Sequence, residues 1–184
     1  MYVVDVPVLK TERLVLQAPT AGDFPDSLAL WSDPAVTRFL GASPASQEAV
    51  WGRLMRYVGQ WAVLGYGYWV VRDRLTGGFI GEAGFADNHR AMRPDVSGIP
   101  EVGWALCMQA QGRGLGREVV GALTSWADSH LGPGRTVCLI HPDNAASLRV
   151  ARAHGYRTFA ETLYDGGPVL VLERWPGAGD SPRT

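Results

Sequence analysis

The chain has 184 residues, of which 46% are hydrophobic and 19% charged, a balance typical of one globular domain with a sizeable core. The formal net charge of −1 removes any electrostatic reason to bind nucleic acid or an anionic membrane, and the longest apolar run is far too short to span a bilayer. Because the only two cysteines are Cys107 and Cys138 and no signal peptide opens the chain, we expect no disulfide framework and a cytoplasmic location.

In chain order, the first half predicts one strand, two helices and then a strand pair. Apolar and polar residues alternate in the first strand, and Thr20 with Asp23 resembles a capping box for the first helix. Ser46 is a good N-cap for the second helix, whose apolar stripe continues until Gly65 ends it. After a lead-in over 1–10, the expected elements are a strand over 13–18, a helix from 20 to 31, a helical turn at 33 with a break at 41–44, a helix from 46 to 64, and strands over 66–72 and 78–85.

A long segment over 86–100 separates this half from the next. It has two prolines and no periodicity, and a loop of that length either has a function or is mobile. Its His89, Arg90, Arg93 and Asp95 could contact an acceptor or a second subunit, or could simply be solvated. Beyond it we expect a strand over 101–107, a helix from 115 to 130, a strand over 136–140, a helix from 144 to 155, strands over 156–163 and 169–175, and a disordered tail over 176–184.

The stretch from Glu101 to His130 carries the clearest chemical signal. An apolar strand leads into a glycine turn, and a helix is predicted to begin inside that turn, Gln111-Gly112-Arg113-Gly114-Leu115-Gly116-Arg117. The free N–H groups and positive dipole end of a helix N-terminus bind phosphate, and the glycines allow close approach. A P-loop would need Gly-Lys followed by Ser or Thr, and a Rossmann turn would need glycine where Arg117 stands. A nicotinamide-dependent oxidoreductase therefore remains a rival hypothesis, but Arg117 does not match the Rossmann motif.

The turn resembles the Gln-x-x-Gly-x-Gly turn of the GNAT acyltransferases, which cradles the pyrophosphate of acetyl-CoA; Gln111, Gly114 and Gly116 match it position for position. Other motifs resemble the branch named for the N-terminal acetyltransferases of ribosomal proteins: Thr11-Glu12-Arg13-Leu14-Val15-Leu16, Ser32-Asp33-Pro34-Ala35-Val36-Thr37, Gly78-Phe79-Ile80-Gly81-Glu82-Ala83-Gly84, Asn144-Ala145-Ala146-Ser147 and His154-Gly155-Tyr156. The resemblance implies one GNAT domain over 1–175, of α/β (α+β) class. Its sheet would be mixed, mostly antiparallel and seven-stranded, with a splayed parallel central pair and about four flanking helices.

The resemblance further implies an acetyl-CoA-dependent N-acetyltransferase. It would transfer the acetyl group directly to a primary amine in a ternary complex, with a protein N-terminus or a small molecule as acceptor. It implies no metal, and a monomer or homodimer. The donor arm would pair with strand backbone as an extra strand does, and a backbone N–H near Leu106 to Met108 would meet the thioester oxygen. The implied donor-binding residues are Leu106, Cys107, Met108, Gln111, Gly112, Arg113, Gly114, Leu115, Gly116, Arg117, Asn144 and Ser147.

The catalytic residues are less well defined by the resemblance. An amine with a pKa near 10 needs a base, and Glu101 is the first candidate, followed by Glu82 and Glu161; the alternative for each is a charge at a strand end. Many relatives use a tyrosine acid seven residues after the asparagine, but Ala151 occupies that position. We therefore assign the acid role to Ser147, which could instead only cap a helix. This departure keeps open a non-catalytic acyl-CoA sensor or partner-binding module, which would bind the donor without turnover.

Overall fold

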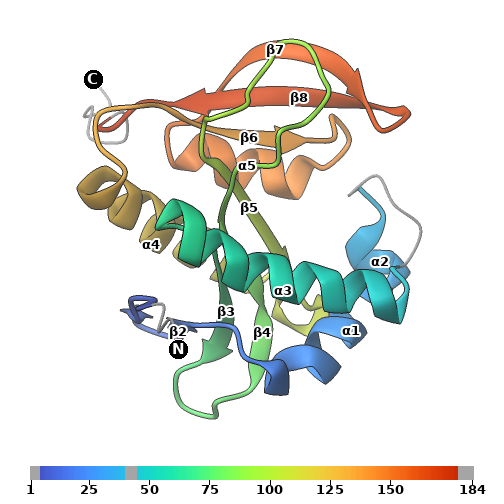
Figure 1. The fold of residues 1–184 in the computed structure, drawn as a ribbon, viewed down its shortest axis with the longest axis vertical. Helices are drawn as coiled ribbons and strands as arrows, with labels where there is room; N and C mark the ends of the chain where they lie inside the picture. The colour runs from blue at the N-terminus through green and yellow to red at the C-terminus, as the bar shows by residue number, and fades with distance from the viewer. Residues whose placement is uncertain (1–4, 40–44, 178–184) are drawn as a thin grey trace.

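The computed structural model describes residues 5–39 and 45–177, and its centre is one eight-stranded sheet with the strand order β1-β2-β3-β4-β5-β6-β8-β7 (Figure 1). All neighbouring strands are antiparallel except β5 and β6. The elements are β1 (Leu9–Lys10), β2 (Leu14–Gln17), the 3₁₀ helix η1 (Ala21–Asp23), α1 (Phe24–Ser32), α2 (Pro34–Thr37), α3 (Gln47–Leu64), β3 (Tyr68–Asp73), β4 (Phe79–Ala86), β5 (Glu101–Leu106), the 3₁₀ helix η2 (Met108–Ala110), α4 (Leu115–His130), β6 (Thr136–Ile140), α5 (Ala145–Ala153), β7 (Arg157–Tyr164) and β8 (Gly167–Arg174).

The expected mixed, mostly antiparallel sheet is confirmed, with one more strand than predicted. Leu9 and Lys10, expected in the lead-in, form the edge strand β1 opposite Leu16 and Val15. A pair of residues is too short to show a periodicity, so its pairing is not visible in the sequence. The predicted break at 41–44 lies outside the described residues, and so does the predicted tail from 178 onward.

The predicted helix ends are confirmed by the caps that form them. Ser46 Oγ accepts a hydrogen bond from Ala49 N at 3.2 Å, and Gly65 ends α3 with a left-handed φ of 72°. The Thr20–Asp23 capping box also forms, with Thr20 N donating to Asp23 Oδ2 at 2.7 Å, although it starts η1 one turn before α1. Local polar chemistry therefore defines where the helices that flank the cavity begin and end.

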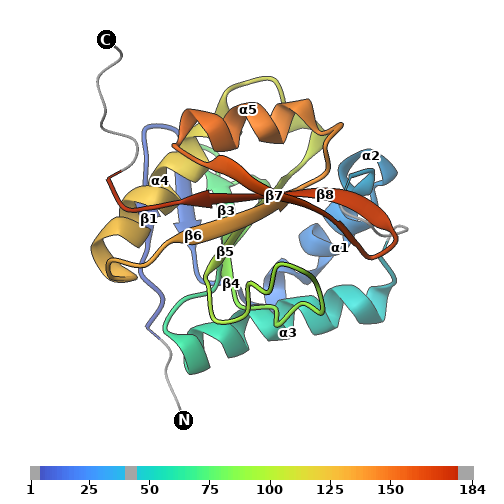
Figure 2. The ribbon, with the colours of Figure 1, turned by 90° about the horizontal axis from the view of Figure 1, so that it is seen from above.

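Aromatic side chains connect the helices to the sheet. Trp69 of β3 meets Trp61 of α3 and Trp126 of α4 edge to face, with ring centroids 4.6 and 5.1 Å apart. Such pairs add about 0.5–1.5 kcal/mol each beyond the area they bury. Figure 2 shows α3 on one side of the sheet and α5 on the opposite side. Among the described residues, no helix is long and apolar enough to cross a membrane.

The parallel pair at the centre of the sheet is incomplete. Glu101 and Val137 are the one register pair that joins β5 and β6 in the described chain, and Val137 N donates to Pro100 O at 3.0 Å. On their other edges, β5 pairs with β4 at six positions and β6 pairs with β8 at five. The two strands therefore start together and then diverge, as expected for a splayed pair.

An ion pair connects α4 to the last strand. The guanidinium of Arg174, 6% exposed, donates from Nη1 and Nη2 to the two carboxylate oxygens of Asp128, both at 2.6 Å, and from Nε to His154 O at 2.9 Å. The hydrogen bonds from Arg174 outweigh burial and lower the pKa of Asp128. Asp128 lies inside α4, not at the end of a strand as a dinucleotide-binding carboxylate would, and is engaged in a contact that holds the fold together.

We expect Asp128→Asn to lower the free energy of unfolding by about 1–3 kcal/mol at pH 7, because a charged hydrogen-bonded pair is lost. The folded-state pKa of Asp128 lies below its unfolded value of about 3.9, so the pair stabilises the fold fully above that value and loses this contribution as the pH falls through the folded-state pKa. Urea unfolding at pH 7 and below pH 4 should show the difference between wild type and variant shrinking in acid. The exposed Asp5→Asn is the control. A difference that stays constant with pH would contradict the pairing.

Candidate functional site

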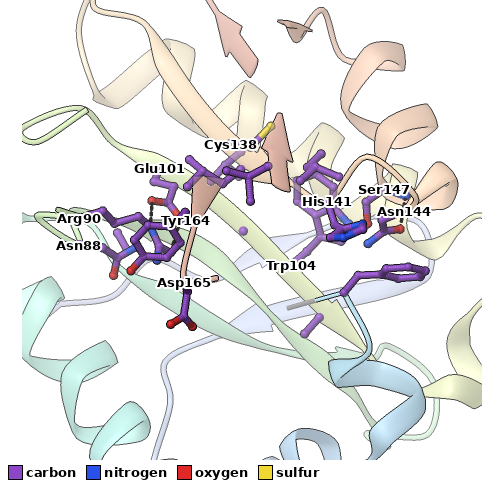
Figure 3. A pocket seen from close by; sticks show the side chains of 18 of the residues that line it. Asn88, Arg90, Glu101, Trp104, Cys138, His141, Asn144, Ser147, Tyr164 and Asp165 are labelled. Carbon is purple, nitrogen blue, oxygen red and sulfur yellow. Dashed lines mark hydrogen bonds and ion pairs between the residues drawn. The ribbon is translucent and has the colours of Figure 1, made fainter. Parts of the chain in front are cut away.

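A cavity of about 470 Å³ lies where β5 and β6 diverge, and both strands line it together with α1, α3, α5 and the β7–β8 hairpin. Figure 3 shows its polar side chains in two groups. Arg90, Glu101, Tyr164 and Asp165 lie at one end, called here the Glu101 end; His141, Asn144 and Ser147 lie at the other, called the Ser147 end. Within the described residues, no group of three His, Cys, Asp or Glu side chains is placed to hold a metal ion.

At the Glu101 end of the cavity, the carboxylate of Glu101 forms an ion pair with Arg90 through two hydrogen bonds. Arg90 Nε and Nη2 donate to its two carboxylate oxygens, both at 2.7 Å, and the side chain of Glu101 is 11% exposed. Burial disfavours the charge on Arg90, but the hydrogen bonds to Glu101 outweigh it and raise the pKa of Arg90. The Arg90 guanidinium also lies 4.8 Å from the ring centroid of Tyr164. This end of the cavity therefore holds a fixed, neutralised charge pair.

The 86–100 loop is packed on the sheet and not simply solvated. Val96 is buried against Val137 of β6 and Val171 of β8, and Asp87 Oδ2 accepts a hydrogen bond from Gly98 N at 3.1 Å. Of the four polar residues singled out there, Arg90 lines the cavity. His89 is exposed, and Asp95 accepts a hydrogen bond from Ser97 N inside the loop. The packing of the loop thus places the Arg90 side chain beside the carboxylate of Glu101.

Glu82 of β4, the second candidate base, lies behind the cavity wall. It has no exposed surface and accepts hydrogen bonds from Ser27 Oγ at 2.5 Å, Trp31 Nε1 at 2.6 Å and Tyr57 Oη at 2.9 Å. Trp31 and Tyr57 line the cavity, but Glu82 does not. The carboxylate therefore orients two wall residues, one from α1 and one from α3.

Two stacked tyrosines form the wall of the cavity beside β5. The rings of Tyr57 and Tyr68 are 4.5 Å apart and within 3° of parallel. A Cβ at Gly103 would come within 2.0 Å of the Tyr68 hydroxyl, so only glycine leaves room for it. Burial raises the pKa of both tyrosines, which keeps both hydroxyls protonated at neutral pH. Ala151, where relatives carry tyrosine, is fully buried in the core.

At the Ser147 end, two predicted residues lie together. Asn144 Oδ1 accepts a hydrogen bond from Ser147 N at 3.1 Å, so Asn144 caps α5, and both residues line the cavity. Figure 3 places Glu101 and Ser147 at opposite ends, so the fold does not bring the two predicted catalytic residues into contact. Glu161, the third candidate base, is exposed on β7 and does not line the cavity.

Asp165 lines the cavity and was missed by sequence reasoning. It stands at the tip of the β7–β8 hairpin with a positive φ of 52°, where aspartate is one of the few residues tolerated besides glycine. Its sequence, Asp-Gly-Gly, indicates only a turn. The pairing of β8 with β6 carries this tip to the cavity, and no local pattern predicts that contact.

The glycine turn has the backbone conformations that its sequence predicts. Gly112 and Gly114 have φ values of 72° and 76°, where an L side chain is strained, and Gly114 is the N-cap of α4. Gln111 Nε2 donates to Leu106 O at 3.3 Å, which ties the turn to the end of β5. The first N–H groups of α4 therefore start directly beside the diverging strand.

The carboxylate closest in sequence to this turn is neutralised. Glu118, in the first turn of α4, accepts hydrogen bonds from Thr11 Oγ1 at 2.5 Å and from Arg13 N and Nε at 2.8 and 2.7 Å. Burial opposes ionisation of Glu118, but these hydrogen bonds outweigh it and lower its pKa. Arg13 Nη1 also donates to Arg113 O at 2.9 Å. Arg113 and Arg117 are exposed with no ion pair among the described residues, so the helix end presents positive charge and suits a phosphate.

The backbone of β5 has a free edge toward β6. Cys107 N donates to Ile80 O at 2.9 Å, which directs it toward β4. Successive residues of a strand point to opposite neighbours, so Trp104 and Leu106 present their backbone groups to the gap. Cys107 is half-buried, and burial raises the pKa of its thiol. Met108 begins η2 and is exposed. Of the three predicted strand residues, Leu106 thus has the accessible edge.

Comparison with known proteins agrees with this geometry. Residues 13–157 match the model of the acetyltransferase (GNAT) domain. A Bordetella pertussis structure described as a GNAT-family acetyltransferase is 34% identical with a TM-score of 0.82, covering 92% of this chain and 99% of the other. An uncharacterised N-acetyltransferase of Bacillus subtilis, YoaA, is 27% identical over 168 residues, which are 88% of this chain and 90% of that protein.

The fold is shared with a member of the expected ribosomal-protein branch. RimL, an α-N-acetyltransferase of ribosomal protein L7/L12 whose structure was solved with coenzyme A, is 18% identical with a TM-score of 0.73, covering 94% of this chain and 99% of RimL. The expected mixed sheet and acyltransferase class therefore agree with the relatives found.

We expect Glu82→Gln to lower the free energy of unfolding by about 2–4 kcal/mol, because three buried donors would face an amide that carries one acceptor oxygen. Urea unfolding measures this directly, with the exposed Glu12→Gln as control. Tyr57→Phe, which removes one of the three hydrogen bonds, should cost about 1 kcal/mol. An unfolding curve of Glu82→Gln that overlies that of the wild type would contradict this role.

Proposed function

The chain belongs to the GNAT acetyltransferase family, and from that premise we propose that it moves the acetyl group of acetyl-CoA directly to a primary amine within a ternary complex. One observation carries the proposal. The gap between β5 and β6 forms a cavity whose strand β5 leads directly into a cationic glycine turn at the start of α4. A long donor with a phosphate at one end and a thioester at the other would follow β5 from this turn to the cavity, which the turn residues themselves do not line.

The residues present suit the donor along that path. The turn Gln111–Arg117 would hold the pyrophosphate. Thr11 and Arg13 hydrogen-bond the carboxylate of Glu118, so the N-terminal end of α4 keeps its positive charge. The free backbone edge at Trp104 and Leu106 would pair with the amide groups of the pantetheine arm, as an added strand does. Asn144 and Ser147 line the cavity on the far side of the gap and would hydrogen-bond the arm there.

The reaction then needs one proton removed and one supplied. The amine nitrogen attacks the thioester carbonyl, the new C–N bond forms, and the C–S bond breaks to release the thiolate. We assign Glu101 as the group that takes the amine proton, directly or through one water, since each of its oxygens keeps a lone pair beyond the bond to Arg90. The Ser147 hydroxyl stands at the opposite end of the cavity and would hydrogen-bond the departing thiolate and pass it a proton from water, which is a small demand at a thiol pKa of about 8.5. The acceptor thus enters from the Glu101 end and the donor lies toward the Ser147 end.

The first test is thermal unfolding with acetyl-CoA, and with NADH as the control ligand. Acetyl-CoA at about a hundred times its dissociation constant should add roughly 2.7 kcal/mol and raise the melting temperature by several degrees. The double variant Arg113→Gln/Arg117→Gln should lose most of this shift, whereas Arg152→Gln, exposed near the end of α5, should keep it. No shift with acetyl-CoA would overturn the proposal. A shift without thiol release from any amine would favour the non-catalytic sensor.

Glu101→Gln should lower kcat/KM by about a hundredfold or more, because the amine proton loses its acceptor. The melting temperature of each variant is needed as well, since Arg90 would lose its charged partner. Glu161→Gln, on the exposed surface of β7, is the matched control and should leave the rate unchanged. A Glu101→Gln enzyme with wild-type kcat would remove Glu101 from the mechanism.

A further inference from the structure

We propose that the amine acceptor also carries a carboxylate, and that Arg53 and Arg56 on α3 bind it. The inference rests on the proposed transfer to an amine and names the acceptor class, a small amino acid or amino-acid-like molecule. Two features support this acceptor class: the charged side chains that line the cavity, and the fact that only some of them form ion pairs.

Five ionised side chains line the cavity, three arginines and two carboxylates: Arg53, Arg56, Arg90, Glu101 and Asp165. Arg90 and Glu101 neutralise each other in their two-point ion pair. Arg53 and Arg56 form no ion pair with any carboxylate in the described part of the chain. The α3 wall therefore presents two cations, one helical turn apart, that lack a negative partner.

Arg53 is held in place by an aromatic face and not by a carboxylate. Its guanidinium carbon lies 3.8 Å from the ring centroid of Trp31. Trp31 is itself fixed, because its Nε1 donates to the buried Glu82. Stacking on a ring leaves the N–H donors at the guanidinium edge available, and that edge fits a carboxylate with two parallel hydrogen bonds.

Gln60 extends the same face of α3. Arg53, Arg56 and Gln60 stand at positions i, i+3 and i+7, so all three point the same way, and all three line the cavity. The Oε1 atom of Gln60 is buried with no hydrogen-bond partner in the described residues. A buried acceptor without a donor is unfavourable, so a water or a donor group elsewhere on the ligand would meet this oxygen once the cavity is filled.

The Glu101 end carries the opposite charge, because Asp165 adds a carboxylate to the neutral pair of Arg90 and Glu101. Asp165 is exposed at the hairpin tip, and Figure 3 shows it on the side of Arg90 and Tyr164. A zwitterion, with an ammonium toward Asp165 and a carboxylate toward Arg53 and Arg56, matches both charges. A polyamine would place extra positive charge against Arg53 and Arg56, and a peptide N-terminus has an amide where the carboxylate would be. The charge pattern therefore favours a free amino acid over either.

The test compares matched acceptors that differ in one charge. Thiol release from acetyl-CoA is measured with each of the common amino acids, with the corresponding amino-acid amides, and with spermidine. We expect the best free acid to exceed its amide at least tenfold in kcat/KM. Arg53→Gln and Arg56→Gln should each raise KM for that acid by about ten- to a hundredfold, with little change in kcat or in KM for the amide. Arg53→Lys should recover part of the loss, and Arg152→Gln should behave as wild type.

Two outcomes overturn the inference while leaving the acetyltransferase intact. These are an amide or spermidine preferred over every free acid, and an acid preference that survives in both arginine variants. If no acceptor releases thiol, calorimetry on the complex with coenzyme A compares N-acetyl amino acids with their amides, and equal or absent binding overturns it too. Failure to bind acetyl-CoA, measured beforehand by thermal shift, would instead refute the proposed function on which this inference rests.

Discussion

The divergence of β5 from β6 is the constraint on which the rest of the structure depends. Each strand is held on its outer edge, β5 by β4 over six positions and β6 by β8 over five, whereas a single register pair joins the two. Closing the gap would require both outer ladders to shift, and each ladder hydrogen bond contributes to the stability of the sheet. The cavity is therefore a rigid property of the sheet, and a ligand can meet free backbone groups there without first opening the protein.

Three arginine–carboxylate pairs stabilise the surroundings of this gap, and two of them join segments far apart in the sequence. Arg13 with Glu118 fixes the first turn of α4 to the start of the sheet. The pair of Arg90 and Glu101 attaches the long loop to β5, and that of Arg174 and Asp128 attaches β8 to α4. The first also removes negative charge from the place where an anionic donor would bind. The same contacts that hold the fold together thus determine the local charge of the site.

Features that a few neighbouring residues determine could be predicted from the sequence, whereas features that depend on tertiary contacts could not. The caps of α3 and the glycine turn were predicted because a few neighbouring residues determine them. The strand β1 was not, since two residues carry no pattern. Arg53 lies on a helix that the sequence shows mainly as an apolar stripe, and only the packing of Trp31 beneath it reveals its orientation. Glu82 was predicted as a candidate base, but its three buried donors come from α1 and α3, and no motif connects those helices to it.

The proposed donor and acceptor sites differ in the same way. Most of the proposed donor site consists of backbone groups, glycines and one helix terminus within a continuous stretch from Leu106 to Arg117, so its chemistry can be predicted from a motif. The proposed acceptor site is assembled from side chains of α3, the 86–100 loop and the β7–β8 hairpin. These segments can change independently without disturbing the strand divergence or the turn. One donor site can therefore serve different acceptors, and the acceptor of this chain has to be inferred from the charges that its own tertiary structure brings together.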